Sequence, residues 1–208
     1  MTSDSANTEI ARYFAQPGMP AGNRDPVGAL VSLLAAGERN RTAFRSLTDE
    51  FEVGRDEWFR KNVLDLVLGF IEHVLNGGSP AHPDIQAIEE LKAFVDIREG
   101  EFIQQRPVEI SAILTQHLEA ILDDLTIDSR EDLQQVELQS VFDVSYDQYL
   151  ALTRRPIESA METLQQQLRY ATENRDRLLM ADSEMKLRAL EPLFLLAVAQ
   201  PRTLGGRY

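Results

Sequence analysis

The sequence contains no cysteine and no long apolar run. Without cysteine, the 208-residue chain cannot form disulfide bonds or thiolate zinc sites, and it has no thiol nucleophile. Its C-terminal apolar run, 193–199, is seven residues long, far short of the roughly eighteen that a membrane helix needs. The N-terminus also lacks the basic and then apolar layout of a secretory signal. We therefore expect a soluble cytoplasmic protein with no transmembrane segment.

Recognisable catalytic motifs are missing as well. The three histidines, His73, His82 and His117, lie at spacings that suggest neither a catalytic triad nor a zinc-binding helix. The sequence has no glycine-rich phosphate-binding loop. His82 lies in a proline-flanked loop, where a histidine is usually only solvated. The sequence thus predicts neither enzymatic activity nor a cofactor-binding site.

The net charge of −13 is concentrated in one part of the chain. Residues 72–147 contain seventeen acidic and four basic residues, whereas the acidic and basic residues outside this range cancel. Because phosphate backbones repel such a surface, direct nucleic-acid binding through this region is disfavoured. Basic protein partners or divalent cations are the favoured ligands. The alternative is that the acidity only maintains solubility.

Apolar residues recur at helical spacing, and no segment alternates between apolar and polar residues long enough to predict a strand. Asp25 followed by Pro26 is typical of a helix N-cap with proline at the first helical position. The sequence therefore predicts an all-α fold, a compact helical bundle. The apolar residues at helical spacing in one predicted amphipathic helix are Phe59, Val63, Leu66, Val67, Phe70, Ile71 and Val74.

Changes in composition predict four segments. Residues 1–24 are rich in small polar residues, proline and glycine, which predicts a mobile lead, with a short helix over 8–15 as an alternative. An acidic helical domain follows over 25–152. A helical extension over 153–200 and a mobile tail over 201–208 complete the chain.

Residues 71–102 resemble residues 118–149. The two segments align without a gap at an offset of 47 residues, and most of their apolar positions stay apolar. This similarity predicts a helix-turn-helix unit that has been duplicated within the acidic domain. Five aligned pairs are identical: Glu72/Glu119, Leu75/Leu122, Glu90/Glu137, Leu91/Leu138 and Asp96/Asp143.

The turn of the second copy is the best candidate for a metal site. Hard cations such as calcium and magnesium need several oxygen ligands, which converging carboxylates supply. An EF-hand is disfavoured, because Ser129 stands where glycine is required and Gln135 stands at the last ligand position. The alternative is that these acids cap the following helix and complement its dipole. The candidate ligands are Asp123, Asp124, Asp128 and Glu131.

Beyond Pro156 the apolar residues follow a heptad spacing. Three heptads predict either a coiled coil with another chain or a long helix packed on the domain's own core. The first alternative makes the protein a homo-oligomer through its C-terminal helices. The spaced residues are Ile157, Met161, Leu164, Leu168, Ala171, Arg175 and Leu178. The predicted partner-binding residues are Arg154, Arg155, Met161, Leu164 and Leu168.

The second copy resembles the TerB-like domains, the tellurite-resistance-associated helical family. The family's turn typically reads Ala-Asp-Gly-x-Ile-x-x-x-Glu, which Asp124, Ile127 and Glu131 match, while Asp123 and Leu125 replace the alanine and the glycine. The resemblance implies a compact all-α domain of the kind found in metal-stress, membrane-associated or phage-defence assemblies. It also implies an acidic site for cations, which the replaced glycine weakens.

Three functions are consistent with these patterns. We expect first a non-catalytic protein-interaction module, or scaffold, in a stress-response or defence assembly. The second hypothesis is a cation-responsive sensor that uses the acidic turn over 123–131. The third is an acidic inhibitor that occupies the basic groove of another protein.

Overall fold

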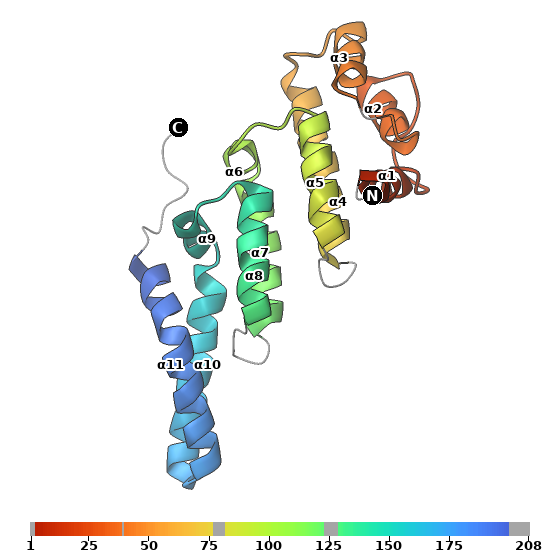
Figure 1. Ribbon diagram of the computed structural model, residues 1–208. Coiled ribbons are helices and arrows are strands. Elements are labelled where there is room, and N and C mark those ends of the chain that lie inside the picture. The colour runs from red at the N-terminus through yellow and green to blue at the C-terminus, as the bar shows by residue number, and fades with distance from the viewer. Residues whose placement is uncertain (1–2, 39, 77–81, 123–128, 200–208) are drawn as a thin grey trace. The chain divides into compact units, whose positions relative to one another are not determined.

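A computed structural model describes residues 3–38, 40–76, 82–122 and 129–199 (Figure 1). These residues form eleven α-helices and no strand, so the predicted all-α class is confirmed. No helix in the described ranges combines the length and the apolar character that crossing a membrane requires. The chain divides into two compact units, Met1–Glu101 and Phe102–Tyr208.

The first unit contains five helices, and side-chain caps start several of them. The Asp25 side chain accepts a hydrogen bond from the Gly28 amide (2.8 Å), and Asn40 accepts one from the Ala43 amide (2.7 Å). Such caps satisfy amides that have no partner inside the helix. The helices are α1 (Ser3–Phe14), α2 (Pro26–Ala35), α3 (Arg41–Glu50), α4 (Glu57–Asn76) and α5 (His82–Phe94).

Aromatic side chains join the helices of the first unit. Phe44 of α3 packs near Phe59 of α4 and Phe94 of α5, with ring centroids 6.4 and 5.7 Å apart. Phe14 of α1 stacks on Phe70 of α4 with ring centroids 6.2 Å apart. All five rings are buried. Their burial removes a large apolar area from water and fixes α1, α3 and α5 around α4.

Helix α1 corrects the expectation of a mobile lead over residues 1–24. Ala6, Ile10 and Phe14 follow one another at intervals of four residues and are each at most 2% exposed. Four-residue spacing places them on one face of the helix, and that face packs on the rest of the unit. These three apolar residues were hard to recognise as one helix face in the sequence, because polar residues separate them.

An ion pair between the partly buried Arg60 and the buried Glu101 closes the end of α5. Arg60 pairs with the carboxylate of Glu101 and donates to the backbone oxygens of Val95 and Asp96, each at 2.8 Å. Glu101 also accepts a hydrogen bond from the Arg98 amide (3.0 Å). Burial raises the pKa of Glu101, but the hydrogen bonds from Arg60 and Arg98 and their positive charges outweigh it and lower the pKa below its ordinary value.

The second unit contains the remaining helices. Phe102 and Phe142 meet edge to face with ring centroids 6.1 Å apart, and Tyr149 is fully buried in the same unit. A two-residue turn joins the last two helices into an antiparallel hairpin (Figure 1). The elements are α6 (Glu101–Gln105), which begins at the boundary between the units, α7 (Pro107–Ile121), α8 (Ser129–Phe142), α9 (Tyr146–Leu152), α10 (Arg154–Asn174) and α11 (Arg177–Ala199).

Local structure recurs at the offset of the sequence repeat. Helix α8 begins 47 residues after α5. Asp96 and Asp143, 47 residues apart, both have left-handed backbone, with φ of 54° and 53°. The capping bond from the Arg98 amide to Glu101 (3.0 Å) has its counterpart 47 residues later, from the Ser145 amide to Gln148 (2.8 Å). That the two segments arose by duplication stays a prediction.

The division between the units differs from the predicted boundary at residue 152. Helix α10, the start of the predicted extension, contacts α7 and α9. Ile157 of α10 and Leu150 of α9 are both fully buried. The extension therefore shares a core with the second copy, whereas the first copy packs with α1, α2 and α3. Sequence composition separates acidic from neutral segments, but packing joins segments by their apolar faces.

Candidate interaction surface

The predicted metal ligands fall largely outside the described residues. Asp123, Asp124 and Asp128 lie in the range that the structure does not describe, and Glu131 belongs to α8 without a described side chain. In the ranges that are described, no group of three or more histidine, aspartate or glutamate residues is arranged to hold a metal ion. The predicted site at the turn of the second copy stays a prediction.

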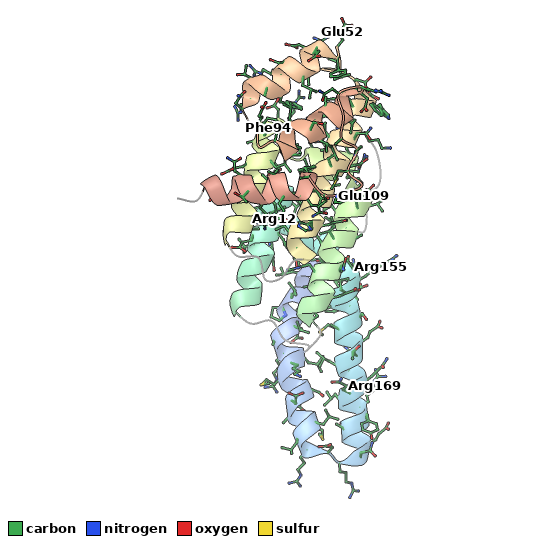
Figure 2. The ribbon with its side chains drawn as sticks, turned by 90° about the vertical axis from the view of Figure 1, so that its right-hand side faces the viewer. Arg12, Glu52, Phe94, Glu109, Arg155 and Arg169 are labelled. Carbon is green, nitrogen blue, oxygen red and sulfur yellow. The ribbon has the colours of Figure 1, made fainter. Side chains whose placement is uncertain are left out.

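The predicted partner-binding residues of α10 have different environments. Met161 is 7% exposed and Leu164 is fully buried, so the chain's own packing covers both. Leu168 is half-buried. Arg154 donates to Glu158 of the same helix at 2.7 Å. Arg155 is exposed on the side of α10 that faces away from α11 (Figure 2).

The heptad residues of α10 are covered by α11. On α11, Ser183, Leu190 and Ala197 lie seven residues apart and are at most 1% exposed. A seven-residue interval returns a helix to nearly the same face. The side chain of Asp176 starts α11 by accepting hydrogen bonds from two amides of its first turn, each at 3.1 Å. The heptad residues of α10 are thus largely buried within the chain, whereas Arg175 and Leu178, the last two of the predicted series, are exposed.

Helix α11 has a second apolar face, which is exposed. Leu178 is 85% exposed, Met185 is 62% exposed and Leu196 is 47% exposed. At about 100° per residue, Leu178 and Met185 lie roughly 140° and roughly 200° around the helix from Ser183, on the opposite side, whereas Leu196 lies roughly 100° from the buried Ala197, on the flank. We call this face the α11 stripe. It consists of Leu178, Ala181, Met185, Ala189, Pro192, Leu196 and Ala199, all of which are exposed.

The α11 stripe is unusual for a helix that packs on only one side. A surface helix of a globular protein typically has one apolar face and one polar face. In α11 the charged residues are confined to the edges between two apolar faces, and Lys186 pairs with Asp182 at 3.2 Å on one such edge. Exposed contiguous apolar surface marks a site of association, because leaving it in water costs free energy.

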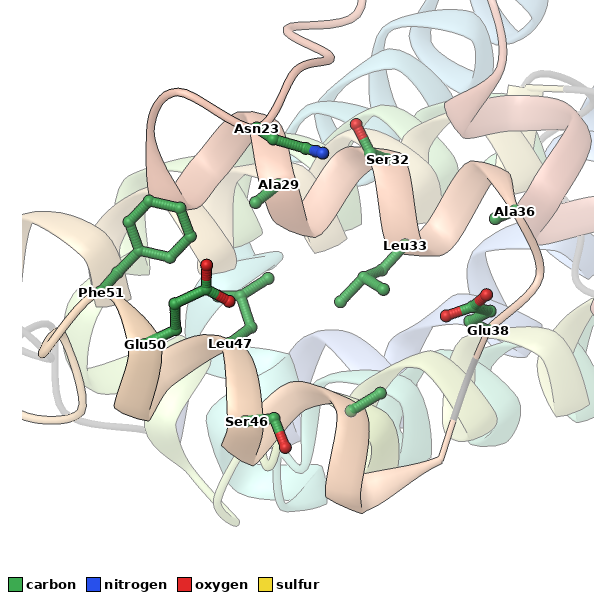
Figure 3. Close-up of a pocket in the computed structure, with 11 residues that line it drawn as sticks. Asn23, Ala29, Ser32, Leu33, Ala36, Glu38, Ser46, Leu47, Glu50 and Phe51 are labelled. Carbon is green, nitrogen blue, oxygen red and sulfur yellow. The ribbon is translucent and has the colours of Figure 1, made fainter.

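A pocket of about 440 Å³ lies between α2 and α3 in the first unit (Figure 3). Leu33 and Leu47 project between the two helices, and the carboxylates of Glu38 and Glu50 lie at opposite ends of the space. Such a lining could hold a ligand that has an apolar body and a positive charge. Its full lining is Asn23, Ala29, Ser32, Leu33, Ala36, Glu38, Ala43, Ser46, Leu47, Glu50 and Phe51.

Some buried polar atoms have no hydrogen-bond partner in the part of the chain that the structure describes. They include the Tyr149 hydroxyl and Nε2 of His117. Burial raises the pKa of Tyr149 and lowers the pKa of His117, so both groups stay neutral at physiological pH. Neither lines the pocket between α2 and α3. These groups do not assemble a catalytic arrangement.

The residues predicted to bind a partner and the exposed apolar residues of the α11 stripe lie on different helices of one hairpin. The prediction of partner binding rested on the heptad spacing of α10, and it stays a prediction. The signal that could have identified the α11 stripe is its composition. Leu178, Met185, Pro192 and Ala199 recur at seven-residue intervals, each two residues beyond a position in line with the apolar Leu190 and Ala197, and one neighbouring helix can cover only one of the two faces.

The chain matches no protein-family model, no curated protein and no solved structure, so its resemblance to TerB-like domains stays a prediction.

Proposed function

We propose that this protein is a non-catalytic interaction module and that the α11 stripe is its binding surface. The observation that carries the proposal is a 23-residue helix with apolar residues on two opposite faces, of which the hairpin and its unit bury only one. An exposed apolar face on a helix that already buries its other apolar face marks a surface for a partner. The stripe extends over about 30 Å, as expected of a groove or helix partner.

The charge distribution supports this placement of the binding surface. Residues 154–199 contain seven acidic and seven basic residues, so the hairpin is neutral in a chain of net charge −13. A neutral apolar surface selects a partner by shape and apolar contact, because it exerts little long-range electrostatic attraction. We place the module in the cytoplasm, in a stress-response or defence assembly, as the TerB-like resemblance implies.

Site-specific photo-crosslinking in intact cells tests the proposal. A photo-crosslinking amino acid replaces Met185 in the stripe, and a control chain carries it in place of Val136, which is 57% exposed on α8. Both positions are exposed apolar residues of the second unit. We expect a discrete crosslinked product from position 185 and none from position 136. The absence of any product from position 185 would contradict the proposed function.

A further inference from the structure

The α11 stripe is complementary to itself when two copies of α11 run antiparallel. A two-fold axis between Arg188 and Ala189 sets each large residue of the stripe against a small or flat one. Large residues facing small ones is how apolar layers interlock without voids, and a two-fold interface requires such self-complementarity. The facing pairs are Leu178 with Ala199, Ala181 with Leu196, and Met185 with Pro192.

The residue beside the axis is compatible with close contact. Ala189 is exposed and carries only a methyl group, so two helix backbones can approach each other at the middle of the pair. The distance between packed helices is set by the side chains at their crossing point. Larger residues lie toward the ends of the stripe, where Leu178 and Leu196 are exposed.

The net charge of the hairpin does not oppose the pairing. The neutral hairpin brings no net charge to the contact, although each whole chain carries −13. A second copy therefore avoids at this surface the repulsion that it would meet at residues 72–147.

From these observations we infer that a second copy of this chain occupies the α11 stripe and forms an antiparallel, two-fold symmetric homodimer through α11. This inference rests on the proposed function, since it names the partner of the same surface. A single helix pair makes a small interface, so the dimer dissociates in the micromolar range.

Sedimentation equilibrium of the full-length protein, from about 1 to 300 µM, tests the self-association. We expect a reversible monomer–dimer equilibrium that Met185→Glu weakens at least about tenfold, because it puts two carboxylates into an apolar contact. The matched control Val136→Glu adds the same charge to an equally exposed apolar position of α8 and leaves the equilibrium unchanged. A wild-type chain that stays monomeric throughout overturns the inference, as does an equal effect of both substitutions.

Disulfide crosslinking of introduced cysteines tests the antiparallel orientation. The sequence contains no native cysteine that could form a competing disulfide. Oxidation joins two copies of Ala189→Cys, because the two residues meet at the axis. Leu178→Cys alone gives no linked dimer, since the two copies of that position lie at opposite ends of the helix pair. Linkage of Leu178→Cys as efficient as that of Ala189→Cys overturns the antiparallel arrangement.

Failure of the dimer is distinguishable from failure of the interaction module. A purified chain that is monomeric, together with a cellular crosslink from position 185 to a different protein, overturns self-pairing and leaves the proposed function in place. No cellular crosslink from position 185 contradicts the proposed function itself.

Discussion

The hydroxyl oxygen of Tyr13 lies 2.8 Å from the point that a Cβ atom on Gly69 would occupy. The tyrosine ring contacts Phe14, Phe70 and His73, with centroid distances of 4.9, 5.3 and 4.9 Å. A Cβ atom at position 69 of α4 would therefore displace the Tyr13 hydroxyl, so glycine allows α1 to pack closely there. Elsewhere in a helix interior, glycine is only a cost in stability.

This contact predicts that Gly69→Ala destabilises the protein by about 1–2 kcal/mol, because overpacking outweighs the gain in helix propensity. Urea denaturation followed by circular dichroism measures the change. The same substitution in a Tyr13→Phe background removes the clashing oxygen and is expected to be neutral or stabilising. A loss of equal size in both backgrounds would show that the hydroxyl is not the obstacle.

The ion pair of Arg60 and Glu101 predicts a pH dependence of stability. The folded-state pKa of Glu101 lies below its ordinary value. Its stabilisation is therefore complete above the unfolded-state pKa of about 4.3 and is lost as the pH falls through the lower folded-state value. Glu101→Gln should remove this acid-side loss and cost about 3 kcal/mol near neutral pH, because Arg60 loses its charge partner. Unfolding free energies measured from about pH 7 to pH 3 check both effects.

Glu99→Gln is the matched control for that experiment. Glu99 is exposed and lies two residues before Glu101 in the chain. Exposed carboxylates contribute little to stability, so we expect a change below about 0.5 kcal/mol. A pH profile of Glu101→Gln that coincides with that of Glu99→Gln would contradict the role of the ion pair.

The two faces of the hairpin should respond differently to truncation. Leu164→Ala on α10 removes a fully buried side chain and should cost about 3 kcal/mol of unfolding free energy. Leu196→Ala on the α11 stripe removes a half-exposed side chain and should change the stability of the monomer by less than about 1 kcal/mol. Urea denaturation well below the dimer concentration range separates the two. Equal costs would mean that the stripe is covered within the monomer.

The acidic turn of the second copy distinguishes the interaction module from a cation sensor. The module needs no cation, so we expect no saturable heat when calcium, magnesium, manganese or zinc is titrated into the protein by calorimetry. A sensor would give saturable heat that the double substitution Asp124→Asn and Asp128→Asn abolishes. Saturable calcium binding that disappears in this variant would favour the sensor over the module.

Local chemistry made much of the secondary structure predictable. The cap at Asp25 and the proline that follows it determine where α2 begins, because both act on amides within one turn. Helices α5 and α8 begin 47 residues apart, which is the offset of the sequence repeat. Helix α1 was harder to predict, because Ile10 and Phe14 identify a buried face only once a neighbouring surface is known. The acidic turn at 123–128 lies outside the described residues, so its role stays a prediction.

The sequence by itself determined that the chain is helical and that residues 72–147 carry its net charge. Only the tertiary structure decided which of two methionines, Met161 and Met185, is buried and which is exposed. Met161 and Met185 both lie on heptad-spaced faces, yet Met161 is 7% exposed and Met185 is 62% exposed. The turn at Arg175 and Asp176 joins α10 to α11, and on α11 the packing buries Ser183, Leu190 and Ala197. A periodicity specifies that a face is apolar, and the packing of the whole unit specifies what covers it.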